Sequence, residues 1–254
     1  MRRIQCALLT AVTVIGITSI ASAADMPMKA APMVAPVAAY NWTGFYVGVN
    51  AGGTWGNSTA TETLVPGSVA YNGIGNSWSS KSSGFVGGGQ IGYNWQPVGS
   101  PLVLGVEADF GYLGLNGSAV SPLAVTQASG TKVATSGNFY STARGRLGYA
   151  ANNWLLYGTG GAIFANVKGQ ITDPVFATPI QPSAQTGWQT GWTAGGGVEY
   201  GFGVWSVKAE YLYFNLGTKN VYATHTGVDL GHAWDIKTTG SIARVGLNYR
   251  FSGL

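Results

Sequence analysis

Apolar residues alternate with small or polar residues along most of the chain after Asn41. The first such stretch, FYVGVNAG (45–52), keeps Phe45, Val47, Val49 and Ala51 on one parity. Side chains two residues apart share one face of a strand, so this pattern predicts a strand with an apolar face. The alternation recurs and predicts eight strands in all: 45–52, 85–95, 102–112, 139–149, 154–167, 192–202, 205–213 and 243–251.

One of these segments, WLLYGTGGAIFANV (154–167), has an ambiguous parity. We predict that Leu155, Tyr157, Ile163 and Ala165 lie on its outer, apolar face.

Charged residues fall on the opposite parity from the apolar ones. This holds for Glu107, Asp109, Arg144, Arg146, Glu199, Lys208, Glu210, Arg244 and Arg250. The aliphatic and aromatic residues alone define the apolar parity, so chance would place half of these charges on the wrong face. The two faces of the predicted sheet are therefore chemically distinct.

The connections between the predicted strands alternate in length. Segments 97–100, 151–153 and 203–204 are short, whereas 53–82, 116–136, 168–187 and 218–238 are long. Long loops at one end and tight turns at the other are typical of a transmembrane β-barrel. We therefore predict an all-β, eight-stranded antiparallel barrel in the outer membrane over residues 41–254, with both termini in the periplasm.

Aromatic residues cluster near the ends that carry the short turns or the termini. We predict that they form one interfacial girdle, made of Trp42, Phe45, Tyr93, Trp95, Tyr149, Trp154, Tyr200, Phe202, Trp205, Tyr249 and Phe251.

The composition agrees with a membrane barrel. Charged residues make up 9% of the chain and the 254 residues include 40 glycines, whereas soluble domains carry about 25% charge. Glycine weakens helix interiors by roughly 1 kcal/mol, which argues against long helices. The basic residues are scattered, so no nucleic-acid partner is expected.

Two segments precede the predicted barrel. Residues 1–23 have a basic start, an apolar stretch and a small-residue cleavage site, as in a secretory signal peptide. Residues 24–40 are rich in alanine and proline and predict an extended periplasmic tether of roughly 50 Å, at about 3.1 Å per residue.

Charged side chains on the inner face of so narrow a barrel need partners, because an unpaired buried charge costs several kcal/mol. An eight-stranded barrel is only wide enough to be filled by side chains. We predict an ionic network that plugs the lumen, made of Glu107, Asp109, Arg144, Arg146, Glu199, Lys208, Glu210 and Arg244. Lumen water in contact with some of these charges is the alternative.

Three stretches resemble the small outer-membrane immunogenic protein family of alphaproteobacteria, a branch of the opacity-type porin superfamily. They are YNWTGFYVGVNAGGTWG (40–56), WSVKAEYLYFNLG (205–217) and ARVGLNYRF (243–251). The resemblance implies an eight-stranded barrel that acts as a surface antigen and helps to hold the envelope together. Expected partners are outer-membrane lipid, lipopolysaccharide and the barrel-assembly machinery.

The two ends of the mature chain carry further expectations from this resemblance. The assembly machinery would read Tyr249 and Phe251, although Ser252–Leu254 follow the aromatic that usually ends such chains. Similar barrels can be linked to peptidoglycan through an N-terminal Ala-Asp, which matches Ala24 and Asp25 here.

Three alternative functions are compatible with the sequence. The barrel could be a narrow pore for small solutes, or an adhesin whose loops present Tyr71, Trp78, Trp188, Tyr222 and Trp234. It could also be a lipid-modifying enzyme that uses the loop residues His225, Asp229, His232 and Asp235, but their spacing fits no zinc site. The glycines at 87, 89 and 92 match a dinucleotide motif only by letters, since no helix follows, so no cofactor is expected.

Overall fold

The computed structural model describes residues 40–63, 75, 77–120, 132–172, 181–182, 188–225 and 228–251. The chain divides into two compact units, Met1–Val37 and Ala38–Leu254, and all described residues belong to the second. Within these ranges no helix has the length and apolar character needed to cross a bilayer. The predicted signal peptide and all of the predicted tether except Tyr40 lie outside the described residues.

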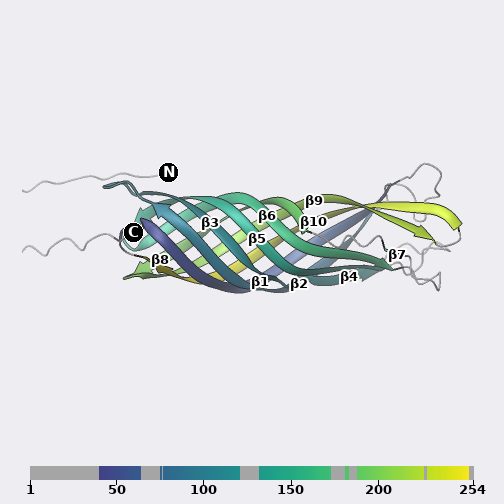
Figure 1. The fold of residues 1–254 in the computed structure, drawn as a ribbon, viewed down its shortest axis with the longest axis horizontal. Helices are drawn as coiled ribbons and strands as arrows, with labels where there is room; N and C mark the ends of the chain where they lie inside the picture. The colour runs from purple at the N-terminus through teal and green to yellow at the C-terminus, as the bar shows by residue number, and fades with distance from the viewer. Residues whose placement is uncertain are drawn as a thin grey trace, which may run out of the picture. The chain divides into compact units, whose positions relative to one another are not determined.

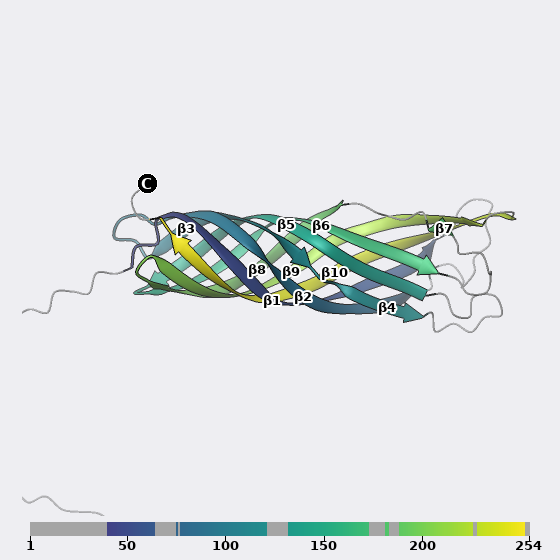
Figure 2. The same cartoon turned by 60° about the horizontal axis from the view of Figure 1, so that its bottom comes forward.

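The second unit is a barrel of antiparallel strands (Figures 1 and 2). The strands are β1 (Gly44–Thr63), β2 (Ser77–Trp95), β3 (Leu102–Leu113), β4 (Asn116–Val120), β5 (Lys132–Ala151), β6 (Trp154–Thr172), β7 (Gln181–Pro182), β8 (Trp188–Phe202), β9 (Trp205–His225) and β10 (Val228–Arg250). Eight of them pair in sequence order, and pairing of β1 with β10 closes the ring. The predicted eight-stranded barrel is thus confirmed.

Two short strands complete this arrangement. β4 follows β3 and pairs with β2 and β5, so it extends the wall, while β7 pairs with β9. A closed ring lets neighbouring strands satisfy each other's backbone groups, as the interior of a bilayer requires.

The two ends of the barrel differ in their connections. At one end, which we call the turn end, β5–β6 and β8–β9 are joined by two residues each. Asn152 and Gly203 occupy the left-handed region there, with φ of 53° and 61°, which these residue types tolerate in tight turns. The first pair of the β1–β10 ladder, Tyr46 with Arg250, also lies at this end. We call the opposite end the loop end.

The strands are longer than the sequence pattern predicted. β9 has 21 residues and β10 has 23, whereas a tilted strand crosses a bilayer with about 9–11. Much of the chain predicted as long connections, such as 53–63 and 228–238, is therefore strand. The prediction failed there because serine, threonine and lysine replace the apolar residues of the outer face, which removes the alternation.

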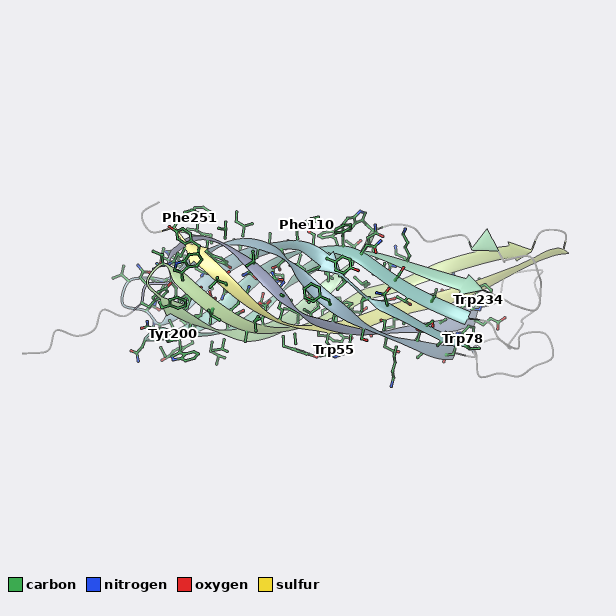
Figure 3. All side chains as sticks on the ribbon, turned by 90° about the horizontal axis from the view of Figure 1, so that it is seen from below. Trp55, Trp78, Phe110, Tyr200, Trp234 and Phe251 are labelled. Atoms are coloured by element: carbon green, nitrogen blue, oxygen red, sulfur yellow. The ribbon has the colours of Figure 1, made fainter. Side chains whose placement is uncertain are left out.

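Two rings of aromatic side chains lie on the outer wall. Ten of the eleven residues predicted for the turn-end girdle lie on this face; the exception, Trp42, is inside the barrel and 2% exposed. A second ring lies further along the strands and includes Trp55, Phe85, Phe110, Tyr112, Phe139, Phe164, Trp192 and Tyr213. Figure 3 shows Tyr200 and Phe251 at the turn end, and Trp55 and Phe110 further along.

The predicted parity of β6 is wrong. Leu155, Tyr157, Ile163 and Ala165 point into the barrel and are at most 5% exposed, whereas Leu156 on the other parity is 68% exposed. Both faces of β6 carry large apolar residues, so its sequence has no polar face from which to assign the parity. The pairing with β5 and β8 fixes the parity instead.

Candidate functional site: the filled lumen

The eight charged residues predicted for the lumen come together in one buried cluster. They project from β3, β5, β8, β9 and β10, and each is only 1–4% exposed. The cluster contains four cations (Arg144, Arg146, Lys208, Arg244) and four carboxylates (Glu107, Asp109, Glu199, Glu210), so its formal charge sums to zero.

Arg144 on β5 is the hub of the cluster. Its Nη2 lies 2.5 Å from Glu107 Oε1 and 2.7 Å from Asp109 Oδ2, both on the neighbouring β3. Its Nη1 reaches across the lumen to Glu210 Oε1 on β9, at 3.1 Å. Thr142 Oγ1 accepts a hydrogen bond from Arg144 Nε and donates one to Asp109. One guanidinium therefore joins three carboxylates from two strands.

Lys208 and Arg244 close the cluster from the other side of the lumen. Lys208 Nζ lies 2.8 Å from both carboxylate oxygens of Glu107. Arg244 Nη2 lies 2.5 Å from Glu210 Oε2 and 3.0 Å from Asp109 Oδ1. These contacts join β9 and β10 to β3, which are not neighbours in the ring.

Arg146 forms a second pair nearer the turn end. Its Nη2 lies 2.7 Å from Glu199 Oε2, and Glu199 also accepts hydrogen bonds from Ser206 and Asn248. The Arg146 guanidinium lies 4.0 Å from the centre of the Tyr157 ring. Arg146 lies two residues closer to the turn end of β5 than Arg144 does. For this reason it pairs with Glu199 and not with Asp109.

Tyrosine hydroxyls supply hydrogen bonds that the sequence analysis did not predict. Tyr46 donates to Glu107 at 2.7 Å and Tyr157 donates to Glu210 at 3.0 Å, while Tyr140 accepts from Arg244. Tyr46 belongs to the polar parity of its strand, and this was the available signal. The ring of Tyr46 lies over Gly92, where a Cβ atom would be 2.4 Å from its hydroxyl. Gly92 of the glycine motif therefore makes room for a lumen side chain.

Apolar side chains fill the lumen on the loop-end side of the charges. The change is visible along one strand, β9, whose inward residues read Ser206, Lys208, Glu210, Leu212, Phe214 and Leu216. The last three belong to a buried cluster with Val86, Leu113, Leu115, Tyr140, Ile163, Ala165, Val167 and Ile242.

A smaller apolar cluster lies on the turn-end side of the charges. It contains Trp42, Val103, Leu155 and Tyr157, with Tyr40 and Ala150 packed against it. The backbone N–H of Trp42 donates to Gln96 Oε1 at 3.0 Å, which ties the residues before β1 to the β2–β3 turn. Three layers thus fill the lumen in series: apolar, ionic and apolar.

The remaining predicted residues are placed only in part. Tyr249 and Phe251 are in edge contact, 5.2 Å between ring centres, and Phe251 N donates to Phe45 O. Trp78 and Trp234, proposed as adhesive contacts, are instead buried inside the barrel near the loop end (Figure 3). Trp188 is exposed.

Several predictions fall outside the described residues. These are Ala24, Asp25, Tyr71, the terminal Ser252–Leu254 and the side chains of Tyr222, His225, Asp229 and His232. In the part of the chain that is described, His, Cys, Asp and Glu form no group that could hold a metal ion.

The chain is similar in sequence to proteins of the outer membrane. The family model of the outer membrane protein β-barrel domain matches residues 17–251. A 31 kDa outer-membrane immunogenic protein of Brucella melitensis is 37% identical over 242 residues, which are 91% of this chain and 93% of that protein. A 22 kDa outer membrane protein of Rhizobium leguminosarum bv. viciae is 32% identical over 71% of this chain and 67% of that protein.

The fold comparison agrees with the sequence comparison. The crystal structure of OprG from Pseudomonas aeruginosa superposes with a TM-score of 0.52, covering 84% of this chain and 98% of that one at 12% identity. The resemblance inferred from the sequence is confirmed: the chain belongs to the family of outer membrane proteins with a β-barrel domain, which includes the outer-membrane immunogenic proteins.

Proposed function

We propose that the protein is a structural outer-membrane barrel that neither conducts solutes nor catalyses a reaction. Its turn end and both termini face the periplasm, and its loop end is displayed on the cell surface. In this role it contributes to the integrity of the envelope.

The filled lumen is the observation that carries this proposal. A conducting pore needs a continuous water path, but the charged side chains here bind each other across the lumen. Arg144 joins β5 to β9, and Lys208 joins β9 to β3. The apolar layers on both sides of the cluster add two further barriers to ions.

The alternative functions receive less support. A narrow porin would need the three layers to open. For a loop-mediated adhesin, two of the five proposed contact residues, Trp78 and Trp234, lie inside the barrel. A lipid-modifying activity would depend on His225 and His232, so lipid analysis of His225→Ala and His232→Ala variants tests it.

Planar-bilayer recording of the refolded full chain tests the central claim. We expect no unitary current steps, provided that insertion is verified by flotation of protein-containing vesicles and by heat-dependent gel mobility. The double variant Arg144→Ser/Phe214→Ser is the matched control for a lumen that conducts. It removes the hub of the ionic layer and one residue of the apolar layer. Reproducible current steps from the unaltered protein, scaling with the amount inserted, would overturn the proposal.

A further inference from the structure

The outer wall carries charge in a restricted zone. All four carboxylates and all four cations of the cluster are buried in the lumen. Between the two aromatic rings, no described Asp, Glu, Lys or Arg side chain points toward the lipid. Beyond the second ring, toward the loop end, Lys81 on β2, Lys168 on β6 and Lys237 on β10 are all exposed. We call these three residues the lysine collar.

The three lysines lie at one level of the barrel. Lys81 is four residues beyond the outward-facing Phe85 on the same strand, and Lys168 is four residues beyond Phe164. Lys237 is four residues beyond Ser241, which is directly opposite Tyr213 of the second ring.

The register shows that their side chains point outward. Odd-numbered residues of β2 face out, as Phe85 and Ile91 do. On β10, Lys237 shares the parity of the exposed Val245 and lies between the buried Ile236 and Thr238. Lys168 follows the buried Val167 on β6.

The height of the collar matches the headgroup region of the outer leaflet. Four residues span about 13 Å along a strand, or about 10 Å along the membrane normal when the strand is tilted by about 40°. Interfacial aromatic rings lie at the boundary between acyl chains and headgroups. The ammonium groups therefore lie where the phosphates of an outer-leaflet glycolipid are found.

The collar has an unbalanced positive charge. None of its three lysines makes an ion pair within the described part of the chain. The described carboxylates are buried, apart from Asp235, whose Oδ1 accepts a hydrogen bond from Asn220. Lysine binds phosphate as a point charge, so the collar is complementary to an anionic headgroup.

From this placement we infer that the lysine collar binds the phosphate groups of the glycolipid in the outer leaflet. The lipid would thereby be ordered around the barrel and the depth of the protein in the membrane would be fixed. This inference uses the proposed orientation of the barrel but does not depend on whether the lumen conducts.

The test measures binding of bisphosphorylated lipid A, in mixed micelles, to the folded full chain. Each lysine near an anionic lipid surface contributes about fivefold in affinity. The strands β2, β6 and β10 are not neighbours in the ring, so each lysine meets its own lipid, and Lys81→Gln/Lys168→Gln/Lys237→Gln should weaken binding about fivefold at each of the three sites. The corresponding triple arginine variant should restore it. Gel mobility before and after heating verifies that every variant is folded.

A matched control is available on the same hairpin. Lys219 on β9 is exposed, but it is paired with the inward-facing Ile236. The register therefore places Lys219 on the inner face of the wall and not on the face that carries the collar. Lys219→Gln should change the affinity much less than Lys237→Gln.

Two further ligands separate the sources of phosphate. The unaltered chain should bind dephosphorylated lipid A no better than the triple glutamine variant does. Inorganic phosphate at the same concentration should not compete with bisphosphorylated lipid A. Equal affinity of the unaltered chain and the triple glutamine variant would overturn the inference. Equal affinity of the unaltered chain for dephosphorylated and bisphosphorylated lipid A would also overturn it, as would full competition by inorganic phosphate.

Discussion

Removal of the Arg144 side chain should destabilise the barrel more than any other single loss from the ionic cluster. Arg144→Ala leaves four carboxylates with three cations, and three carboxylates each lose a contact of 3.1 Å or less. A buried charge left without its partner costs roughly 3–5 kcal/mol. We expect a loss of this size in the free energy of unfolding.

The coupling to Glu107 provides the sharper test. Glu107→Ala alone removes the 2.8 Å partner of Lys208, whose other carboxylate contact is Glu210 Oε1 at 4.0 Å. The double variant restores equal numbers of cations and carboxylates. Its cost should therefore be smaller than the sum of the single costs by about 2–3 kcal/mol, the upper range for groups in one ionic network.

Urea unfolding of the refolded chain in lipid vesicles, followed by tryptophan fluorescence, measures these free energies. Arg144→Met keeps most of the side-chain volume, so a cost similar to that of Arg144→Ala assigns the effect to the charge. A cycle on Asp109 and Arg146, which share no ion pair within 4 Å, serves as the comparison and should show weaker coupling. Additivity of Arg144 and Glu107 within about 0.5 kcal/mol would refute the reasoning.

Three further predictions concern the barrel wall and the two ends of the chain. The folded protein should resist SDS at room temperature and change its gel mobility after boiling, since its wall is a closed ring; unchanged mobility contradicts this. Phe251→Ala should lower the yield of assembled protein in cells more than deletion of Ser252–Leu254 does, since Phe251 completes the outward face of β10. Equal yields of Phe251→Ala and the unaltered chain would show that the assembly machinery does not read this aromatic. We also propose that Ala24 is linked to peptidoglycan: trypsin digestion of purified sacculi should release the Ala24–Lys29 peptide with an added muropeptide mass, and recovery only with a free amine rules the linkage out.

The sequence determined the architecture of the wall and the residues that face its interior. Period-two alternation identified eight strands, and the inner and outer faces of seven of them were assigned correctly. This succeeded because lipid on one side and a crowded lumen on the other impose opposite chemistry on successive residues. Where that contrast is missing the prediction failed, as on β6 and in the loop-end extensions of β1 and β10.

Only the tertiary structure decided which lumen residues meet. Neighbouring strands suggested that Arg144 pairs with Glu107, but the contact of Lys208 with the same carboxylate crosses the ring. The position of Trp42 inside the turn end and the tyrosine hydrogen bonds to Glu107 and Glu210 are likewise set by the closed ring. Alternation along a strand reports the face on which a side chain lies. The stagger between strands and the curvature of the closed wall determine which side chains share the same height in the lumen, and no local pattern in the sequence records that height.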